Sequence, residues 1–359
     1  MNPFHPYLAT VADAAHGGAA QLAAAGLDTA GLLDFSATTL PGGPPQAVRG
    51  AIAQVRLERY PDPHASALKA ALARHHGVDP AQVLVGNGAA ELIVAIALAA
   101  LGLGDRALVV GPTFGEYARA IQGAGAEAIE VRTEEPAVIR EAAAAISPRL
   151  IFLCNPNNPT GHLWSQEDLD ALAETSFLVV DQAYASFVDP EPACTPLGDR
   201  VILRSLTKDC GLAGLRLGYA VGTPEILGAI RTLLPPWSVN ALAQAAGVAA
   251  IGSHAEIQSR IRNLMVERDR LAAALALQGW EVSVRATPFF LVRVQDAAAT
   301  SRRLLQDALV VRDASSFGLS EWIRLSPQQP FENDRLISAM AALRQEIASG
   351  SPPVDRSPR

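Results

Sequence analysis

Lysine is scarce in this sequence, and one of its two lysines stands where chemistry can be expected. The chain has 29 lysine and arginine residues in total, but Lys69 and Lys208 are its only lysines. Lys69 lies in a helical pattern, SALKAALARHH, whereas Lys208 follows the apolar run VILRS and precedes a glycine-rich segment, in RSLTKDCGLAGLRLGYA. Any reaction that needs a side-chain primary amine therefore has two candidates.

Several polar residues follow apolar runs in the same manner, where buried strands are expected to end. Asp181 closes the run FLVV, and Tyr184 comes three residues later. Because ligands of open α/β sheets bind at the carboxyl ends of the strands, these residues are expected to line a common cleft. The same holds for the segment NPNNPTG after the run LIFLC, and for Ser205, Thr207 and Arg216, which lie near Lys208.

An amine, a carboxylate and anion-binding donors in this order favour pyridoxal phosphate as a cofactor. Its aldehyde needs a primary amine to form a Schiff base, and its ring nitrogen needs a carboxylate partner that keeps it protonated. Its phosphate needs backbone N–H groups at a helix start, with hydroxyls and an arginine. Each residue alone has a simpler explanation: Lys208 as a surface residue, Asp181 as a helix N-cap, NPNNPTG as a turn. The cofactor hypothesis fails only if all these explanations hold together.

Other cofactor and metal motifs are missing from the sequence. GNGAAE (86–91) is not a dinucleotide fingerprint, because Glu91 stands where the third glycine should be. No Walker loop and no nucleophile elbow occurs. The three cysteines, Cys154, Cys194 and Cys210, show no metal-ligand spacing, so neither a metal site nor a disulfide framework is expected.

Charge and composition favour a cytoplasmic enzyme that has a small-molecule substrate. The net charge of −7 and the lack of any basic run argue against a nucleic-acid partner. The first residues, MNPFHPYLATVADAAHGG, lack the pattern of a signal peptide, and no stretch is apolar for long enough to span a membrane. A hydrophobic content of 49% supports a large core.

The elements that must position these residues alternate in type from residue 80 onward. Helices are predicted at 89–104 and 165–176, and the second opens on a capping-box-like pair, Ser165 and Asp168. Short apolar runs predict strands at 83–87, 107–112, 150–156, 177–184, 201–205 and 215–222. Alternating strands and helices predict an α/β domain with a mostly parallel central sheet.

A smaller α+β domain is predicted after about residue 240. Long helical stretches are followed there by four strand-like runs, EVSVRA, PFFLVRV, LVVRD and EWIRLS. The predicted boundaries are an N-terminal arm that joins the small domain (1–44), a large domain (45–245), the C-terminal small domain (246–345) and a disordered tail rich in serine and proline (346–359).

Four motifs, NPxNPTG, DxAY, SLTK and GLAGLRLGY, occur here in the order typical of fold-type I, aspartate-aminotransferase-like pyridoxal phosphate enzymes. The chain resembles this family over nearly its whole length. The resemblance implies that Lys208 forms the Schiff base and that Asp181 pairs with the ring nitrogen. It also implies a homodimer, in which Tyr60 of the RYPD motif reaches the phosphate of the neighbouring subunit's cofactor. The other cofactor-binding residues it implies are Asn158 and Tyr184 for the ring 3-oxygen, Phe114 for the ring face, and Ala89, Ala90, Ser205, Thr207 and Arg216 for the phosphate.

Three further segments resemble one branch of this family, the threonine-phosphate decarboxylases of cobalamin biosynthesis. They are AHGG (15–18), LLDFSA (32–37) and PWSVNALA (236–243). The branch implies a lyase that converts L-threonine O-3-phosphate into (R)-1-aminopropan-2-yl phosphate.

The same resemblance implies which residues bind the substrate. Arg324, in WIRLS, would bind the α-carboxylate, because an arginine fork suits a carboxylate. His16 and Arg312 are candidates for the substrate phosphate. Thr38, Leu40 and Gln328 depart from the branch pattern near the substrate end.

Two alternatives to the decarboxylase stay open. One is an aminotransferase that acts on histidinol phosphate or a related amino acid and needs 2-oxoglutarate for its second half-reaction. The other is a catalytically silent homologue that binds an amino acid as a sensor. The complete set of cofactor-site residues argues against the second alternative.

Overall fold

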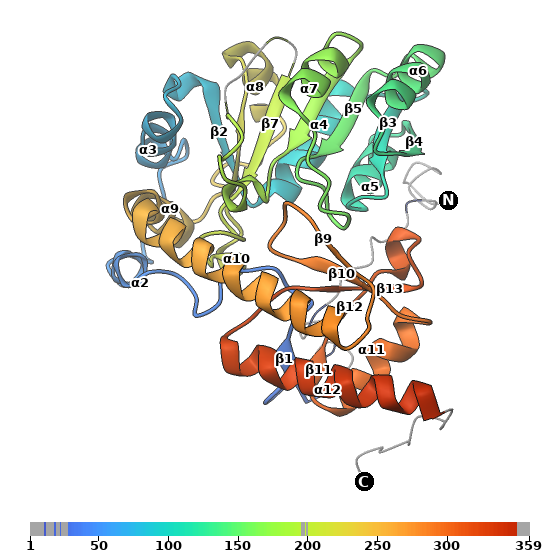
Figure 1. The fold of residues 1–359 in the computed structure, drawn as a ribbon. Helices are drawn as coiled ribbons and strands as arrows, with labels where there is room; N and C mark the ends of the chain where they lie inside the picture. Colours follow the sequence, from blue (N-terminus) through green and yellow to red (C-terminus); the bar gives the residue numbers. More distant parts are fainter. Residues whose placement is uncertain are drawn as a thin grey trace, which may run out of the picture.

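The computed structural model describes residues 11, 18, 22, 28–194, 198 and 200–349, which form a large α/β domain and a smaller domain beside it (Figure 1). A seven-stranded sheet forms the centre of the large domain in these residues, with the order β2-β8-β7-β6-β5-β3-β4. Its strands are β2 (Val83–Gly86), β3 (Arg106–Gly111), β4 (Glu127–Arg132), β5 (Leu150–Cys154), β6 (Phe177–Asp181), β7 (Arg200–Ser205) and β8 (Gly218–Val221).

The sheet is mostly parallel, which confirms the predicted fold class. β3 pairs in parallel with β4 and β5, and the parallel pairing continues through β6 to β7. β8 runs antiparallel to both β7 and β2. The sequence analysis missed β4, whose residues EAIEVR are half-buried or exposed. An edge strand with charged residues lacks the continuous apolar run that identifies strands buried on both faces.

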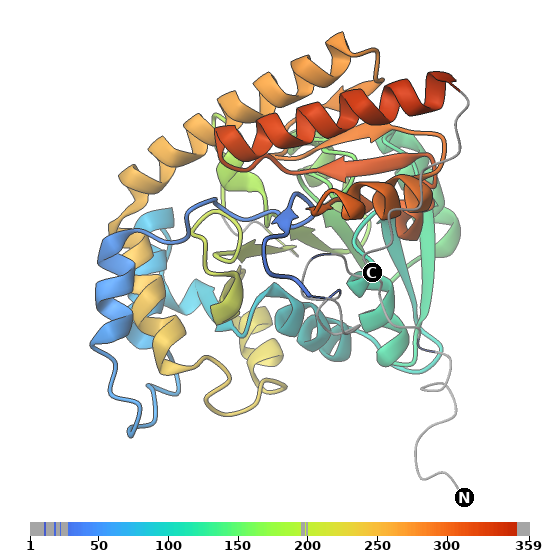
Figure 2. The same ribbon diagram turned by 90° about the horizontal axis from the view of Figure 1, so that it is seen from below.

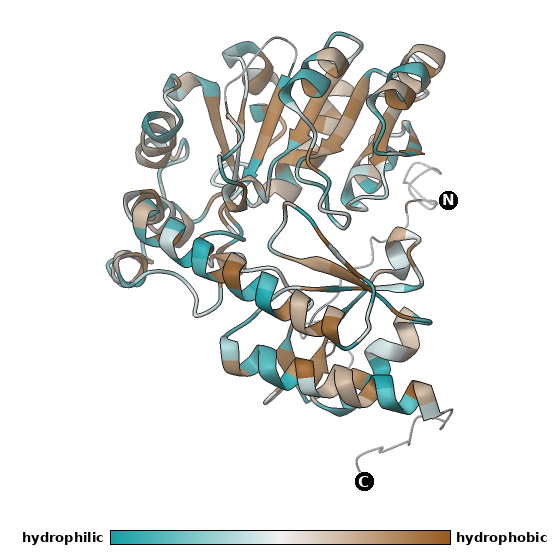
Figure 3. Cartoon of the chain, in the orientation of Figure 1, coloured by the Kyte–Doolittle hydropathy of each residue, from teal (hydrophilic) through white to brown (hydrophobic). Residues whose placement is uncertain are grey.

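Helices cover both faces of this sheet, as the alternating pattern predicts. Helices α4, α5 and α8 pack on one face, whereas α3, α6, α7 and α9 pack on the other. Figure 3 shows the strands as almost continuously hydrophobic between these layers. The helices are α3 (Ser66–His76), α4 (Ala89–Ala100), α5 (Glu116–Gly123), α6 (Pro136–Ile146), α7 (Gln166–Ala173), α8 (Pro224–Arg231) and α9 (Ala241–Gly252); α2 (Gln46–Ala53) packs against α9.

The predicted capping box at the start of α7 is confirmed. The Ser165 hydroxyl accepts a hydrogen bond from the Asp168 backbone N–H at 3.1 Å, and the Asp168 carboxylate accepts one from the Ser165 backbone N–H at 3.2 Å. Each side chain thus satisfies an orphan N–H group of the first turn.

The small domain is built on an antiparallel sheet of four strands in the described residues, ordered β12-β13-β10-β9. Its core also takes in Phe35 from the N-terminal part, and β1 pairs in parallel with β11. Figure 2 shows its two longest helices, α10 and α12, side by side. The elements are β1 (Leu33–Asp34), α10 (His254–Leu277), β9 (Val282–Val284), β10 (Phe290–Arg293), α11 (Ala297–Gln306), β11 (Leu309–Val310), β12 (Arg312–Asp313), β13 (Trp322–Leu325) and α12 (Pro330–Ser349).

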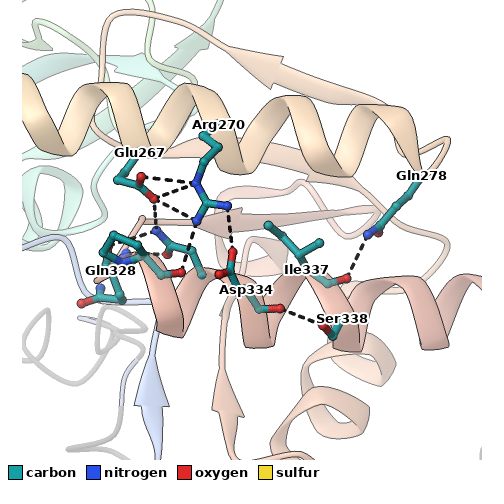
Figure 4. A network of polar contacts seen from close by, with 9 residues as sticks. Glu267, Arg270, Gln278, Gln328, Asp334, Ile337 and Ser338 are labelled. Carbon is teal, nitrogen blue, oxygen red and sulfur yellow. Dashed lines mark hydrogen bonds and ion pairs between the residues drawn. The ribbon is translucent and has the colours of Figure 1, made fainter.

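Polar contacts hold α10 against α12 (Figure 4). Arg270 donates to Asp334 at 2.7 Å and also pairs with Glu267, one turn earlier on its own helix. Farther along, Gln278 donates to the Ile337 carbonyl at 2.9 Å. Helix α12 continues to Ser349, beyond the predicted boundary at 345, because Ile347 still packs on the small-domain core. The domain boundaries themselves stay predictions.

Among the described residues, none of the helices is both long and apolar enough to cross a bilayer.

Candidate active site

A cavity of about 580 Å³ lies at the carboxyl ends of the sheet strands, with residues of both domains in its lining. The location agrees with the rule for ligand binding in open α/β sheets. The cavity brings together most of the predicted site residues, although they are spread over more than two hundred positions of the sequence. They are Ala89, Ala90, Phe114, Asn158, Asp181, Tyr184, Ser205, Thr207, Lys208, Arg216, Arg312 and Arg324.

Lys208 lies in the turn that follows β7. Its backbone carbonyl accepts a hydrogen bond from Leu40 N–H at 2.9 Å, and its Nζ lies 6.0 Å from the centre of the Tyr184 ring. Burial lowers the pKa of the Lys208 amine to about 8, and the positive charges of Arg324 and Arg216 add to this effect. A lowered pKa leaves more of the amine unprotonated near neutral pH, as a nucleophilic lysine requires.

Asp181 ends β6 and is bonded on both of its oxygens. Oδ1 accepts from the Ala183 backbone N–H at 2.9 Å, and Oδ2 accepts from the Tyr117 hydroxyl at 2.7 Å. Burial raises the pKa of the carboxyl, and the Tyr117 hydrogen bond opposes this rise more than any other contact. The two hydrogen bonds thus favour the ionised form of the carboxyl group, whereas its burial favours the neutral form.

Tyr117 is a site residue that the sequence analysis missed. Its fully buried ring stacks on Phe152 with centres 5.1 Å apart, and meets the edge of Phe114 at 5.6 Å. Its position in the first turn of α5, three residues after Phe114, was the available signal. Only the packing of α5 on the sheet brings its hydroxyl to Asp181.

The start of α4 and Arg216 together form a cradle of N–H donors at the cavity. Gly88, the N-cap residue, has φ +79° and provides no side-chain cap, so the first N–H groups of the helix can bind a ligand. A Cβ at Gly88 would lie 2.8 Å from an Arg216 guanidinium nitrogen, and one at Gly218 would lie 2.5 Å from the Ala89 nitrogen. The Ser205 and Thr207 hydroxyls, 2.5 Å apart, line the same cavity. These donors suit a phosphate.

Arg324 projects from β13 and is held in place from three directions. Its guanidinium donates to the Asn158 side-chain oxygen and, at 2.8 Å, to the Ser36 carbonyl, and it lies 4.7 Å from the centre of the Phe289 ring. Since the oxygen of Asn158 is used in this way, its amide nitrogen is the group that can donate to a ligand. Burial lowers the pKa of Arg324.

Arg312 is directly opposite Arg324 in the antiparallel pair β12 and β13. Its guanidinium donates to the Ser316 hydroxyl at 2.7 Å and lies 5.2 Å from the centre of the Phe317 ring. Burial and, to a smaller extent, the charge of Arg324 lower the pKa of Arg312 to about 10. Two buried cations side by side are electrostatically unfavourable, and an anion bound in the cavity would relieve their repulsion.

Two predicted residues are not placed at this cavity. Tyr60 is 83% exposed and stacks on Trp237 with ring centres 5.0 Å apart, and it is not among the described residues that line the cavity. His16 lies outside the described residues.

The three departures from the branch pattern have different positions. Thr38 lines the cavity, and its hydroxyl lies 2.7 Å from that of Ser326. Leu40 is buried in the large-domain core. Gln328 donates to the Asp34 carbonyl at 2.9 Å and belongs to the polar network of α12 (Figure 4). Leu40 and Gln328 therefore support the fold rather than the cavity.

The cavity's donor set fits pyridoxal phosphate. The cradle suits its phosphate, Asp181 its ring nitrogen and Lys208 its aldehyde. Among the described residues, no group of three histidine, cysteine, aspartate or glutamate side chains is arranged to hold a metal ion.

Comparison with known proteins extends these observations. The family model for aminotransferase class I and II matches residues 30–340. Histidinol-phosphate aminotransferase 2 of Cupriavidus pinatubonensis is 34% identical over 341 residues, which cover 89% of this chain and 93% of that protein. The structure of histidinol-phosphate aminotransferase from Sinorhizobium meliloti in complex with pyridoxal-5'-phosphate matches with a TM-score of 0.88 and 25% identity, covering 97% and 99% of the two chains. L-threonine-O-3-phosphate decarboxylase from Porphyromonas gingivalis matches with a TM-score of 0.78 and 30% identity, covering 88% and 100%.

These matches confirm the fold-type I architecture and pyridoxal 5'-phosphate as the cofactor. They overturn the predicted threonine-phosphate decarboxylase, and with it the assignment to cobalamin biosynthesis, because the curated relative and the structure with the TM-score of 0.88 are both histidinol-phosphate aminotransferases. The structure explains why PWSVN misled the sequence analysis. Trp237 packs against exposed Tyr60 and Asn240 caps α9, and neither is among the described residues that line this subunit's cavity.

Proposed function

We propose that this chain, which belongs to the class I and II aminotransferase family, transfers the amino group of histidinol phosphate or a related phosphorylated amine to 2-oxoglutarate. The observation that carries the choice of substrate is the pair of arginines, Arg312 and Arg324, in one cavity with the cofactor-binding residues. The histidinol-phosphate aminotransferases among its relatives support the same choice.

Different residues of the cavity would have different roles in such a transfer. Bound pyridoxal phosphate supplies an electron sink for the bonds of the amine-bearing carbon. Lys208 would hold the cofactor and, once displaced by the substrate amine, its Nζ would take the proton from that carbon. Asp181 would keep the ring nitrogen protonated. Burial raises the pKa of Tyr184 to about 12, so its hydroxyl stays protonated and can donate to the ring 3-oxygen.

Both proposed substrates are anions that must use the same cavity in turn. Histidinol phosphate carries a phosphate, and 2-oxoglutarate carries two carboxylates. Arg324 can bind a carboxylate or phosphate with two parallel N–H groups. Arg312 stands beside it, and the Ser316 hydroxyl and the Phe317 ring orient its guanidinium. We infer that the two arginines together bind the substrate anion.

The proposal is tested with purified protein loaded with pyridoxal phosphate. We expect glutamate from histidinol phosphate plus 2-oxoglutarate, and much less from unphosphorylated histidinol. Arg312→Gln should lower kcat/KM for histidinol phosphate by roughly tenfold to a hundredfold, the value of one hydrogen bond between charged groups. Arg293→Gln is the matched control, because Arg293 lies on β10 of the same sheet but pairs with Glu281 and Glu321 at the exposed surface.

Three results would contradict the proposal. Equal rates with histidinol phosphate and with unphosphorylated histidinol would show that Arg312 does not bind a substrate phosphate. An equal loss in Arg293→Gln would make the effect nonspecific. Bound cofactor without glutamate from any amine would favour a catalytically silent homologue.

We also propose a homodimer in which Tyr60 completes the neighbouring subunit's site. Tyr60 and Trp237 form an exposed aromatic pair, and Leu57 nearby in the sequence is 77% exposed, which supports a surface that a partner covers. The test mixes Tyr60→Ala protomers with Lys208→Ala protomers, each inactive alone. If Tyr60 acts across the interface, mixed dimers contain one intact site and regain activity. Mixtures that stay inactive although mixed dimers form would refute it.

A further inference from the structure

Asp209 follows Lys208 directly but is not among the described residues that line the cavity. Its carboxyl group is buried, and Oδ2 accepts a hydrogen bond from the Ser186 hydroxyl at 2.6 Å. Oδ1 has no hydrogen-bond partner among the described residues. Burial raises the pKa of this carboxyl group, and hydrogen bonding from the Ser186 hydroxyl, together with a weaker contribution of the Cys210 thiol, opposes the rise.

Ser186 belongs to the turn after β6, in the short helix η3 (Ala185–Phe187) that begins directly after Tyr184. The hydrogen bond between Asp209 and Ser186 therefore joins the turn that carries Lys208 to the turn that carries Tyr184. The Lys208 turn is also held by Leu40, whose N–H bonds to the Lys208 carbonyl. Asp209 adds a second, side-chain attachment.

A buried carboxyl group with one unsatisfied oxygen is a costly choice for a core position. Removing a carboxyl group from water costs several kcal/mol unless it is well bonded, and an apolar residue would avoid this cost. Unsatisfied buried groups in native proteins often have a functional reason. The Asp209 contact to Ser186 suggests what that reason is.

We propose that Asp209 is a positioning residue, whose hydrogen bond to Ser186 fixes Lys208 relative to Tyr184. This inference rests on the proposed role of Lys208 as the lysine that holds the cofactor. It does not depend on which amine is the substrate. Asp209 acts through the geometry of the turn and does not itself touch the reacting atoms.

Loss of this bond should change the amine of Lys208 in the cofactor-free protein. A loosened turn lets the amine move toward water, so its pKa rises from about 8 toward the ordinary value near 10.5. A rise of about one unit reduces the unprotonated fraction at pH 7.5 by roughly eightfold. Cofactor loading, which needs the unprotonated amine, should slow by a similar factor.

The experiment follows pyridoxal phosphate loading into cofactor-free protein between pH 6 and pH 10. Borohydride trapping and peptide mass spectrometry then identify the labelled lysine. Asp209→Ala and Ser186→Ala should each raise the apparent pKa of loading by about one unit, and the double variant should add little, since both remove one interaction. Asp209→Asn should load like the wild type, because its amide oxygen can still accept the Ser186 hydrogen bond. Ser338→Ala is the matched control: its hydroxyl bonds within α12, far along the small domain (Figure 4).

The outcomes separate this inference from the proposed function. If Asp209→Asn behaves like Asp209→Ala, the charge matters rather than the hydrogen bond, and the positioning role is refuted. It is equally refuted if Ser186→Ala loads like the wild type. Should Asp209→Ala fail to fold, Ser186→Ala and Asp209→Asn still decide. Labelling of a residue other than Lys208 in the wild type would instead refute the proposed function.

Discussion

Replacing Tyr117 with phenylalanine should change the pH dependence of catalysis while leaving the packing of the cavity floor intact. The Tyr117 hydroxyl donates to Oδ2 of Asp181 at 2.7 Å. The ring contacts with Phe152 and Phe114 involve no hydroxyl, so phenylalanine can keep them. The change therefore removes the hydrogen bond to the buried carboxylate and the weaker contact of the hydroxyl with the Cys154 thiol.

The size of the effect follows from that one hydrogen bond. A hydrogen bond to a charged group contributes about 1.5–3 kcal/mol, which equals about one to two pKa units. Burial already raises the pKa of Asp181, and the Tyr117 bond opposes it, so removing the bond raises the pKa further. The ionised carboxylate then persists only at higher pH. The acid limb of the kcat profile should move upward by about one to two pH units.

The assay is a pH–rate profile of glutamate formation for the loaded enzyme, with Tyr219→Phe as the matched control. Tyr219 is also buried, and its hydroxyl lies 2.7 Å from the His76 ring nitrogen, away from the cavity lining. Both variants lose one buried hydroxyl and should lose similar stability. Only Tyr117→Phe should move the acid limb. An unmoved limb in Tyr117→Phe, or an equal shift in both variants, would refute the reasoning.

Two further predictions concern stability. Burial lowers the pKa of His76 to about 3, so between about pH 6.5 and pH 3 the unfolded state binds a proton that the folded state does not. As the pH falls through this window, His76 should therefore lower the free energy of unfolding by about 1.4 kcal/mol per pH unit. His76→Gln should flatten the pH dependence of the free energy of unfolding, measured by urea unfolding, whereas His64→Gln, at an exposed position, should not. Equal pH dependence in the wild type and both variants would contradict the prediction. Gly161→Ala should lower stability by about 1–3 kcal/mol, because Gly161 has φ +72° and a Cβ there would lie 2.8 Å from the Thr287 hydroxyl. Gly228→Ala, at a position in α8 where a Cβ meets no neighbour, should instead raise stability by about 0.5–1 kcal/mol. Thermal unfolding temperatures of the two glycine variants that shift in the same direction would be inconsistent with this account.

The reaction branch was predicted wrongly for a physical reason. The segment PWSVN resembles a decarboxylase marker, but Trp237 and Asn240 are not among the described residues that line this subunit's cavity. A local motif of this kind can be shared within a family without fixing which reaction the cavity catalyses. Arg312 and Arg324 bear more directly on substrate choice, because both line the cavity.

The sequence by itself predicted six of the seven strands of the central sheet, and most of the residues it proposed for the cofactor site line one cavity. Parallel strands buried on both faces need continuous apolar runs, so the runs before Asp181 and Lys208 marked strand ends that meet at one edge. The same reasoning could not find β4, whose edge position allows charged residues. The local sequence was sufficient to predict a strand wherever burial on both faces required a run of consecutive apolar residues.

Only the tertiary structure decided which neighbouring groups form hydrogen bonds with the residues of that site. Tyr117 is 64 positions from Asp181, and Ser186 is 23 positions from Asp209, yet each pair shares a short hydrogen bond. Such contacts depend on how helices pack on the sheet and how strand-end turns face each other, which no local spacing specifies. The sequence thus predicted a set of cofactor-site residues, most of which line one cavity. The fold decided which neighbours set their protonation and position.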